Sequence, residues 1–154
     1  MAGSLVFQQK AARTLAFKIL FQRKSLGILK LSESWLVEEE NFKAPVLQYL
    51  QQVLAFSEKY QQELEQKISF ALIDWKMDRL QTGLYAVLIV AGSEMKMMEA
   101  KLAPEKLNFA VIANEALEIT QKYLGVEAKK ICNGVLQKMH DERDKALLLP
   151  EQEL

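Results

Sequence analysis

The chain has 154 residues, half of them apolar, so it can bury one continuous core without disulfides or a structural metal. Its twenty basic residues balance twenty acidic ones, so any nucleic-acid binding must come from local basic patches or from a partner. The single cysteine, Cys132, and single histidine, His140, exclude an intrachain disulfide and a Cys/His metal cluster. With no apolar run long enough for a signal peptide or a membrane span, we expect a cytoplasmic protein.

Basic residues interrupt the first predicted helix. Apolar residues recur at helical spacing from Phe7 to Lys24 and predict an amphipathic helix there. Lys10, Arg13 and Lys18 fall between the apolar positions. Such side chains can neutralise phosphates, although taken alone they are more often ordinary solvated charges.

Three further segments carry helical signals in the next part of the chain. A second helix is expected within residues 32–40. Pro45 suits the first turn of a third helix, and its apolar stripe continues to Leu72, as one long helix or as two with a break near Ser57. The next predicted helix, about 78–91, has a wide apolar face, which indicates a central and largely buried element.

Glycines and prolines divide the rest of the chain. Gly92-Ser93 is expected to end the central helix, and the Met-rich stretch 94–102 is then a short helix or an ordered connector. Another amphipathic helix is predicted over about Lys106 to Leu124, with Gly125 closing it. The last helix begins near Val126. No stretch alternates with period two, so an all-α fold is predicted.

No motif in the sequence indicates catalysis. The scattered glycines match neither a phosphate-binding loop nor a dinucleotide fingerprint. Cys132 and His140 are eight residues apart on one predicted helix, too far for a hydrogen bond between their side chains. Glu115 and Glu118 are helix neighbours, but without histidines they do not make a di-metal site and are better interpreted as solvated charges. We therefore expect that the protein is not an enzyme and that it binds no cofactor and no metal.

Two motifs in the C-terminal third carry a family resemblance. Residues 113–119, ANEALEI, and residues 131–138, ICNGVLQK, closely resemble the patterns INEA-E-A and FVNGVLDK of the NusB family, in the same order and spacing. The opening helix, residues 12–21, and the segment Leu80 to Tyr85 resemble two other family helices. The chain differs in having a longer segment between Tyr85 and Asn114, with a Met-rich insertion at 92–105.

The resemblance implies a fold, a set of partners and a binding surface. The fold is all-α and NusB-like, with two packed three-helix-type bundles and about seven helices. It forms a single domain over 1–154, with an N-terminal half of about 5–72, a C-terminal half of about 74–143 and a tail at 144–154. Family members bind boxA-type RNA with the ribosomal protein NusE and join the transcription elongation complex during ribosomal RNA synthesis. The RNA surface would include the first helix and the start of the last, at residues Lys10, Arg13, Lys18, Lys129 and Lys130.

The motif residues also have a purely structural interpretation. A glycine inside a helix costs roughly 1 kcal/mol relative to alanine, so something must favour Gly134. Close helix approach at Gly134, with the Asn133 amide bonded to backbone or to Asn114, would do so. Asn114, Glu115, Asn133 and Gly134 are therefore expected to hold the helices together and to leave RNA contact to the basic residues.

Departures from the family pattern leave alternatives open. Gln8-Gln9-Lys10 stands where the family is rich in arginine, and Ile131 replaces an aromatic residue that could stack on a base. The chain could instead be a helical adaptor or a homodimer with weak or no RNA binding. This domain type also resembles the RNA-binding part of a ribosomal RNA cytosine methyltransferase, and here it could at most guide the substrate.

Overall fold

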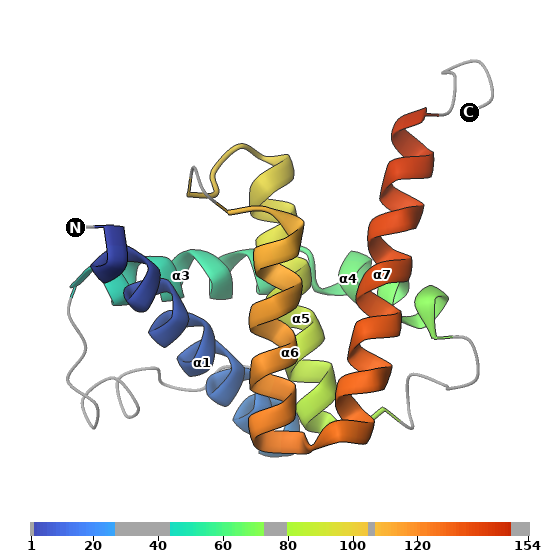
Figure 1. The fold of residues 1–154 in the computed structure, drawn as a ribbon, viewed down its shortest axis with the longest axis horizontal. Coiled ribbons are helices and arrows are strands. Elements are labelled where there is room, and N and C mark those ends of the chain that lie inside the picture. Colours follow the sequence, from blue (N-terminus) through green and yellow to red (C-terminus); the bar gives the residue numbers. More distant parts are fainter. Residues whose placement is uncertain (1, 27–43, 73–79, 105–106, 149–154) are drawn as a thin grey trace.

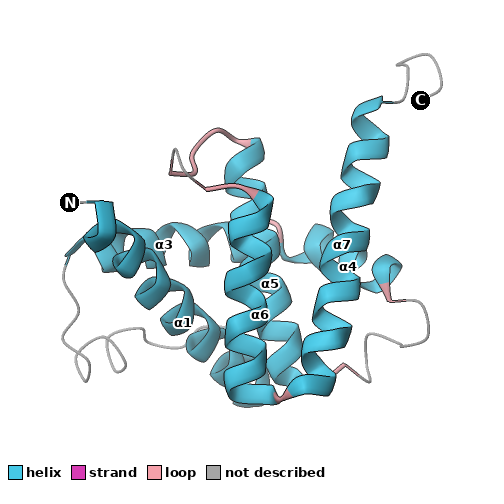
Figure 2. Ribbon diagram, in the orientation of Figure 1, coloured by secondary structure: helices cyan, strands magenta, loops and turns pink. Residues whose placement is uncertain are grey.

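The computed structural model describes residues 2–26, 44–72, 80–104 and 107–148, and all regular structure within these ranges is α-helical (Figure 2). The predicted all-α fold is confirmed, while the helix expected at 32–40 lies outside the described residues. The described helices are α1 (Ala2–Leu26), α3 (Ala44–Lys59), α4 (Gln61–Ala71), α5 (Thr82–Glu99), α6 (Phe109–Leu124) and α7 (Val126–Leu148).

Helix α5 is the centre of the molecule. Every residue from Gly83 to Met95 is buried, as its wide apolar face predicted. Helix α5 contacts α1, α3, α4, α6 and α7. Figure 1 shows α1 and α3 on one side of it, α6 across its front, and α7 with α4 on the other side. The buried side chains form one continuous cluster to which all six described helices contribute.

Local sequence explains how α6 and α7 become an antiparallel pair. The side chain of Asn108 accepts a hydrogen bond of 3.0 Å from the backbone N–H of Val111 and so caps the start of α6. Gly125 then adopts a φ of 97°, a conformation that favours glycine, and ends the helix as predicted. Helix α7 begins at the next residue, so the two helices lie side by side.

The expected end of the central helix at Gly92-Ser93 is wrong. Helix α5 continues through this pair to Glu99, and the Met-rich stretch forms its last turns, with Met95 and Met97 buried. Gly92 allows the side chain of Leu64 on α4 to approach closely. The Ser93 hydroxyl donates to the carbonyl of Ile89 at 2.7 Å, so it is satisfied inside the helix.

Two other boundaries differ slightly from the sequence analysis. The segment 45–72 forms two helices, and the break falls at Tyr60, three residues beyond the expected Ser57. Helix α7 runs to Leu148 and so includes residues that the sequence analysis had placed in the tail.

Two helix glycines offer a matched test of packing. A methyl group added at Gly92 would lie 2.8 Å from a terminal carbon of the buried Leu64, whereas one added at Gly134 would meet nothing within 4 Å. Gly134→Ala is therefore expected to raise the free energy of unfolding by about 1 kcal/mol through helix propensity. The free energy of unfolding of Gly92→Ala should be lower than that of Gly134→Ala by about 1–3 kcal/mol, because the added methyl group overpacks the contact with Leu64. Urea denaturation would measure both, and equal stabilities would show that Leu64 moves aside freely.

Candidate nucleic-acid interface

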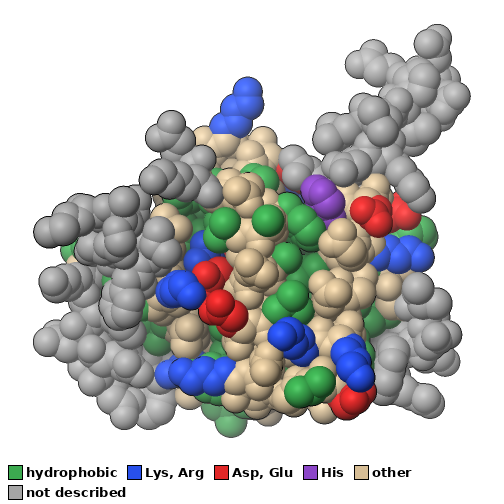
Figure 3. All heavy atoms as spheres, in the orientation of Figure 1, with side chains coloured by type: hydrophobic (Ala, Val, Ile, Leu, Met, Phe, Trp, Pro, Cys, Tyr) green, Lys and Arg blue, Asp and Glu red, His purple; other side chains and the backbone are tan. Residues whose placement is uncertain are grey.

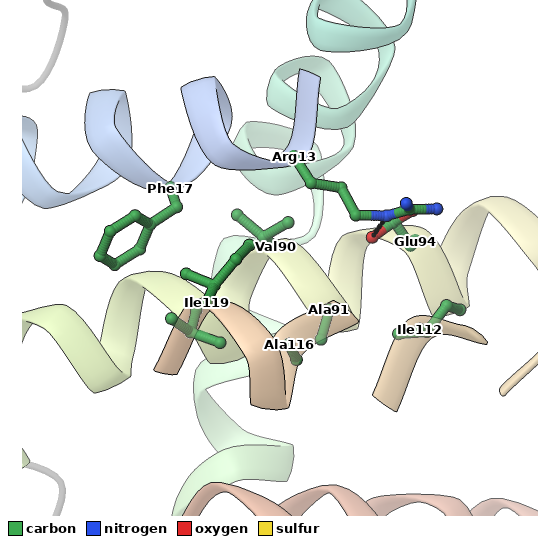
Figure 4. A pocket seen from close by; sticks show the side chains of 9 residues that line it. Arg13, Phe17, Val90, Ala91, Glu94, Ile112, Ala116 and Ile119 are labelled. Atoms are coloured by element: carbon green, nitrogen blue, oxygen red, sulfur yellow. Dashed lines mark hydrogen bonds and ion pairs between the residues drawn. The ribbon is translucent and has the colours of Figure 1, made fainter. Parts of the chain in front are cut away.

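Arg13, expected among the RNA-binding residues, lies inside the protein. Its side chain is 3% exposed, and its Nε atom lies 2.8 and 2.7 Å from the two carboxylate oxygens of Glu94. Figure 4 shows Arg13 reaching from α1 to Glu94 on α5, beside a small pocket lined mostly by apolar side chains. This position differs from the polar face on which the sequence had placed Arg13, because α1 packs directly onto α5. We therefore leave Arg13 out of the candidate interface.

Glu94 joins three helices through its buried carboxylate. The Tyr49 hydroxyl on α3 donates a hydrogen bond to Glu94, which also binds Arg13 of α1. Burial raises the pKa of Glu94 above its ordinary range, although Arg13 and Tyr49 act in the opposite direction. Burial opposes the charge on Arg13, but the charges of Glu94, Tyr49 and Glu115 and the hydrogen bond to Glu94 together outweigh this effect and raise the pKa of Arg13. The triad therefore has a structural role.

Lys10 lies on the surface, but its charge is engaged. The Nζ atom lies 3.2 Å from a carboxylate oxygen of Glu115 and 3.1 Å from one of Glu118, both on α6. Hydrogen bonds to Glu118 and Glu115 raise the pKa of Lys10, so it stays protonated. Glu115, expected as a structural motif residue, thus helps to tie α6 to α1.

Two exposed aromatic rings lie between α1 and α6, at the end of the molecule where α6 turns into α7. The buried ring of Phe17 contacts Tyr123 at a centroid distance of 5.3 Å and Phe21 at 6.2 Å. Phe21 is 38% and Tyr123 41% exposed. The ammonium group of Lys122 lies 5.3 Å from the centroid of the Tyr123 ring. Both residues lie within helices that the sequence predicted to be amphipathic, and their spacing did not mark them as exposed.

Basic residues from α7 extend this aromatic patch. Lys129 donates a hydrogen bond of 2.7 Å to Gln121 of α6, so it lies beside the last turn of that helix. Lys130 is exposed, and its ammonium group lies 3.5 Å from a carboxylate oxygen of Glu127. Figure 3 shows basic side chains gathered over the lower parts of α1, α6 and α7 on this face. We call the following residues the basic-aromatic surface: Phe21, Lys122, Tyr123, Lys129 and Lys130. Lys18 is partly exposed on α1, next to Phe17.

The expected structural role of Gly134 is not what the fold shows. Gly134 and Asn133 are exposed on the outer side of α7, and Asn114 is exposed on α6. Because a Cβ atom at Gly134 would meet nothing within 4 Å, close helix approach does not explain this glycine. The interior side of the same turn is instead filled by Cys132, which is fully buried.

The described residues offer little for catalysis or metal binding. Burial raises the pKa of Cys132 to about 11, which keeps it a thiol. The ring of His140 stacks on Phe109 with a centroid distance of 4.0 Å. Within the described ranges, no group of three or more His, Cys, Asp or Glu side chains could hold a metal ion. None of the helices described there is long and apolar enough to span a membrane.

Within the described ranges the chain is a small all-helical protein with exposed aromatic rings beside lysines. Residues 10–141 match the NusB family model, and the chain belongs to the NusB family. A relative, the transcription antitermination protein NusB of Clostridium botulinum, is 26% identical over 146 residues, covering 85% of this chain and 98% of that protein. The transcription antitermination protein NusB of Bdellovibrio bacteriovorus is 27% identical over 131 residues, covering 85% of this chain and 93% of that protein.

Solved structures agree on the fold. NusB in the complex of antitermination factors NusB and NusE with double-stranded RNA matches with a TM-score of 0.75 and 21% identity, covering 88% of this chain and 97% of that one. NusB of T. maritima matches with a TM-score of 0.73 and 23% identity, covering 91% and 97%. The NusB-like fold expected from the sequence is therefore confirmed.

Proposed function

We propose that this protein is a transcription antitermination factor that binds boxA-type RNA together with the ribosomal protein NusE, without catalysis, in the cytoplasm. Membership in the NusB family supports the general role. The observation that carries the RNA assignment is the exposure of Phe21 and Tyr123, with Lys122 beside the Tyr123 ring and Lys129 bonded to the last turn of α6. Unpaired bases stack on aromatic rings, and lysines neutralise the phosphates between them.

The charges of the protein suggest why a partner is needed. The chain is neutral overall, Arg13 is buried, and Lys10 is bound by two carboxylates. Three lysines of the basic-aromatic surface can supply only a few phosphate contacts, and affinity for RNA rises with their number. NusE would add further contacts on the same RNA, and the pair would then join the transcription elongation complex.

A salt titration with a matched variant tests this proposal. Binding of a labelled single-stranded boxA-type RNA would be followed by fluorescence anisotropy with and without NusE. Lys122→Ala/Lys129→Ala/Lys130→Ala is expected to weaken binding and to lower the slope of log affinity against log salt by about 2, since each lost phosphate contact contributes about 0.7.

The control variant removes three exposed lysines elsewhere, Lys59→Ala/Lys67→Ala/Lys101→Ala, and so changes the net charge equally. It should leave the slope unchanged. Equal losses in the two variants would contradict the assigned surface. No RNA binding with or without NusE would favour the alternative of a helical adaptor or a homodimer.

A further inference from the structure

Lys10 is a surface cation whose charge is outweighed by its own neighbours. Its side chain is 42% exposed, and carboxylate oxygens of both Glu115 and Glu118 lie within 3.2 Å of its ammonium group. Two carboxylates around one ammonium group leave this cluster with a net charge of −1. The adjacent Arg13–Glu94 pair adds one charge of each sign and leaves that balance unchanged.

The arrangement follows from the spacing of the two acids. Residues three apart on a helix share a face, so the carboxylates of Glu115 and Glu118 converge on one point beside α1. Glu118 is well exposed, at 65%, and so presents its charge to solvent at this point. A phosphate that approaches Lys10 therefore meets net repulsion and would have to displace a carboxylate first.

We propose that Glu115 and Glu118 act as an acidic brake on RNA binding: they hold Lys10 and thereby confine RNA to the basic-aromatic surface. This inference rests on the proposed RNA-binding function. Lys10 and Phe21 are eleven residues apart on α1, or about 16 Å at the helical rise of about 1.5 Å per residue. That separation is about twice the screening length of roughly 8 Å at physiological ionic strength. Glu118 is closer to this surface, because it lies four residues, or about 6 Å, before Lys122 on α6. Part of its charge therefore acts on Lys122, and the Lys10→Ala comparison below separates that part from the release of Lys10.

The test releases Lys10 with two isosteric substitutions. Glu115→Gln/Glu118→Gln is expected to bind the labelled boxA-type RNA about tenfold more tightly at low salt. Its salt slope should become steeper by about 0.7, the contribution of one new phosphate contact on a single strand. Lys10→Ala should change the slope little in the wild-type background and should remove the added slope in the double variant.

A second lysine held by two acids supplies the control. Lys96 contacts Glu63 of α4 and, at 3.2 Å, Glu99 of α5. Neither acid lies on the helices that form the basic-aromatic surface. Glu63→Gln/Glu99→Gln makes the same change in net charge, and we expect RNA affinity within about twofold of the wild type. Thermal melts of all variants would identify any that lose their fold.

The outcomes separate the brake from the proposed function. If the wild type binds RNA but Glu115→Gln/Glu118→Gln changes neither affinity nor slope, the brake is overturned and the RNA assignment stands. If both acidic double variants gain RNA affinity equally, the effect is one of net charge and the brake is again overturned. If neither the wild type nor any variant binds RNA with NusE present, both proposals fall.

Discussion

Glu94→Ala is expected to lower the free energy of unfolding by about 3–5 kcal/mol, because it leaves the buried charge of Arg13 without its partner. The Arg13 side chain is only 3% exposed, so bulk water does not solvate the charge that is left behind. The Tyr49 hydroxyl would lose its acceptor at the same time. Urea denaturation followed by circular dichroism would measure the loss.

An apolar double variant provides the matching control. Arg13→Met/Glu94→Leu removes both charges and keeps most of the volume, and such replacements of buried ion pairs are often neutral or stabilising. We expect it to recover most of the stability that Glu94→Ala loses. If the double variant were as unstable as the single one, the loss would come from packing rather than from an unpaired charge. Substitutions of Arg13 therefore report on stability and are unsuitable as probes of RNA contact.

Tyr123→Ala is expected to weaken binding of a single-stranded boxA-type RNA by about 5- to 150-fold, which corresponds to about 1–3 kcal/mol for one stacked base. The ring is 41% exposed and packs against Phe17, which holds it at the surface within reach of a base. Fluorescence anisotropy at one fixed salt concentration would measure the change. The salt slope should stay the same, because stacking involves no phosphate.

Two further variants separate stacking from other effects. Tyr123→Phe keeps the ring and should bind RNA as the wild type does, unless the hydroxyl makes the contact. Phe70→Ala removes a ring that is 69% exposed on α4, away from the basic-aromatic surface, and should have no effect. Equal weakening by Phe70→Ala and Tyr123→Ala would argue against a defined stacking site.

The sequence predicted helices well where apolar spacing was regular, and it failed where tertiary contacts decide a boundary. Asn108 and Gly125 act through local geometry, and the end of α6 at Gly125 was predicted correctly. Gly92-Ser93 also has the composition of a helix end, yet α5 continues because Gly92 fits against Leu64 of another helix. A contact with a residue so far away along the chain leaves no trace in local spacing.

The candidate site was harder to predict than the fold. Lys10 and Arg13 are three residues apart and equally basic, but one lies at the surface and the other inside, paired with a residue 81 positions away. Glu94 would have been a signal only with α5 predicted to continue past Gly92-Ser93, because a charged residue inside a buried helix calls for a buried partner. Phe21 and Tyr123 gave no such signal, because an aromatic residue at helical spacing is usually buried.

The burial of α5 also has a consequence for synthesis of the protein. Helix α5 leaves the ribosome before α6 and α7, which cover much of its apolar surface in the finished fold. Until those two helices have followed, this surface stays open to water and to other chains, a state that favours aggregation. Translation that stops within residues 105–125 should therefore yield an aggregation-prone fragment that chaperones bind, rather than a smaller stable protein. Helices α6 and α7 complete the core only after α5 has been synthesised.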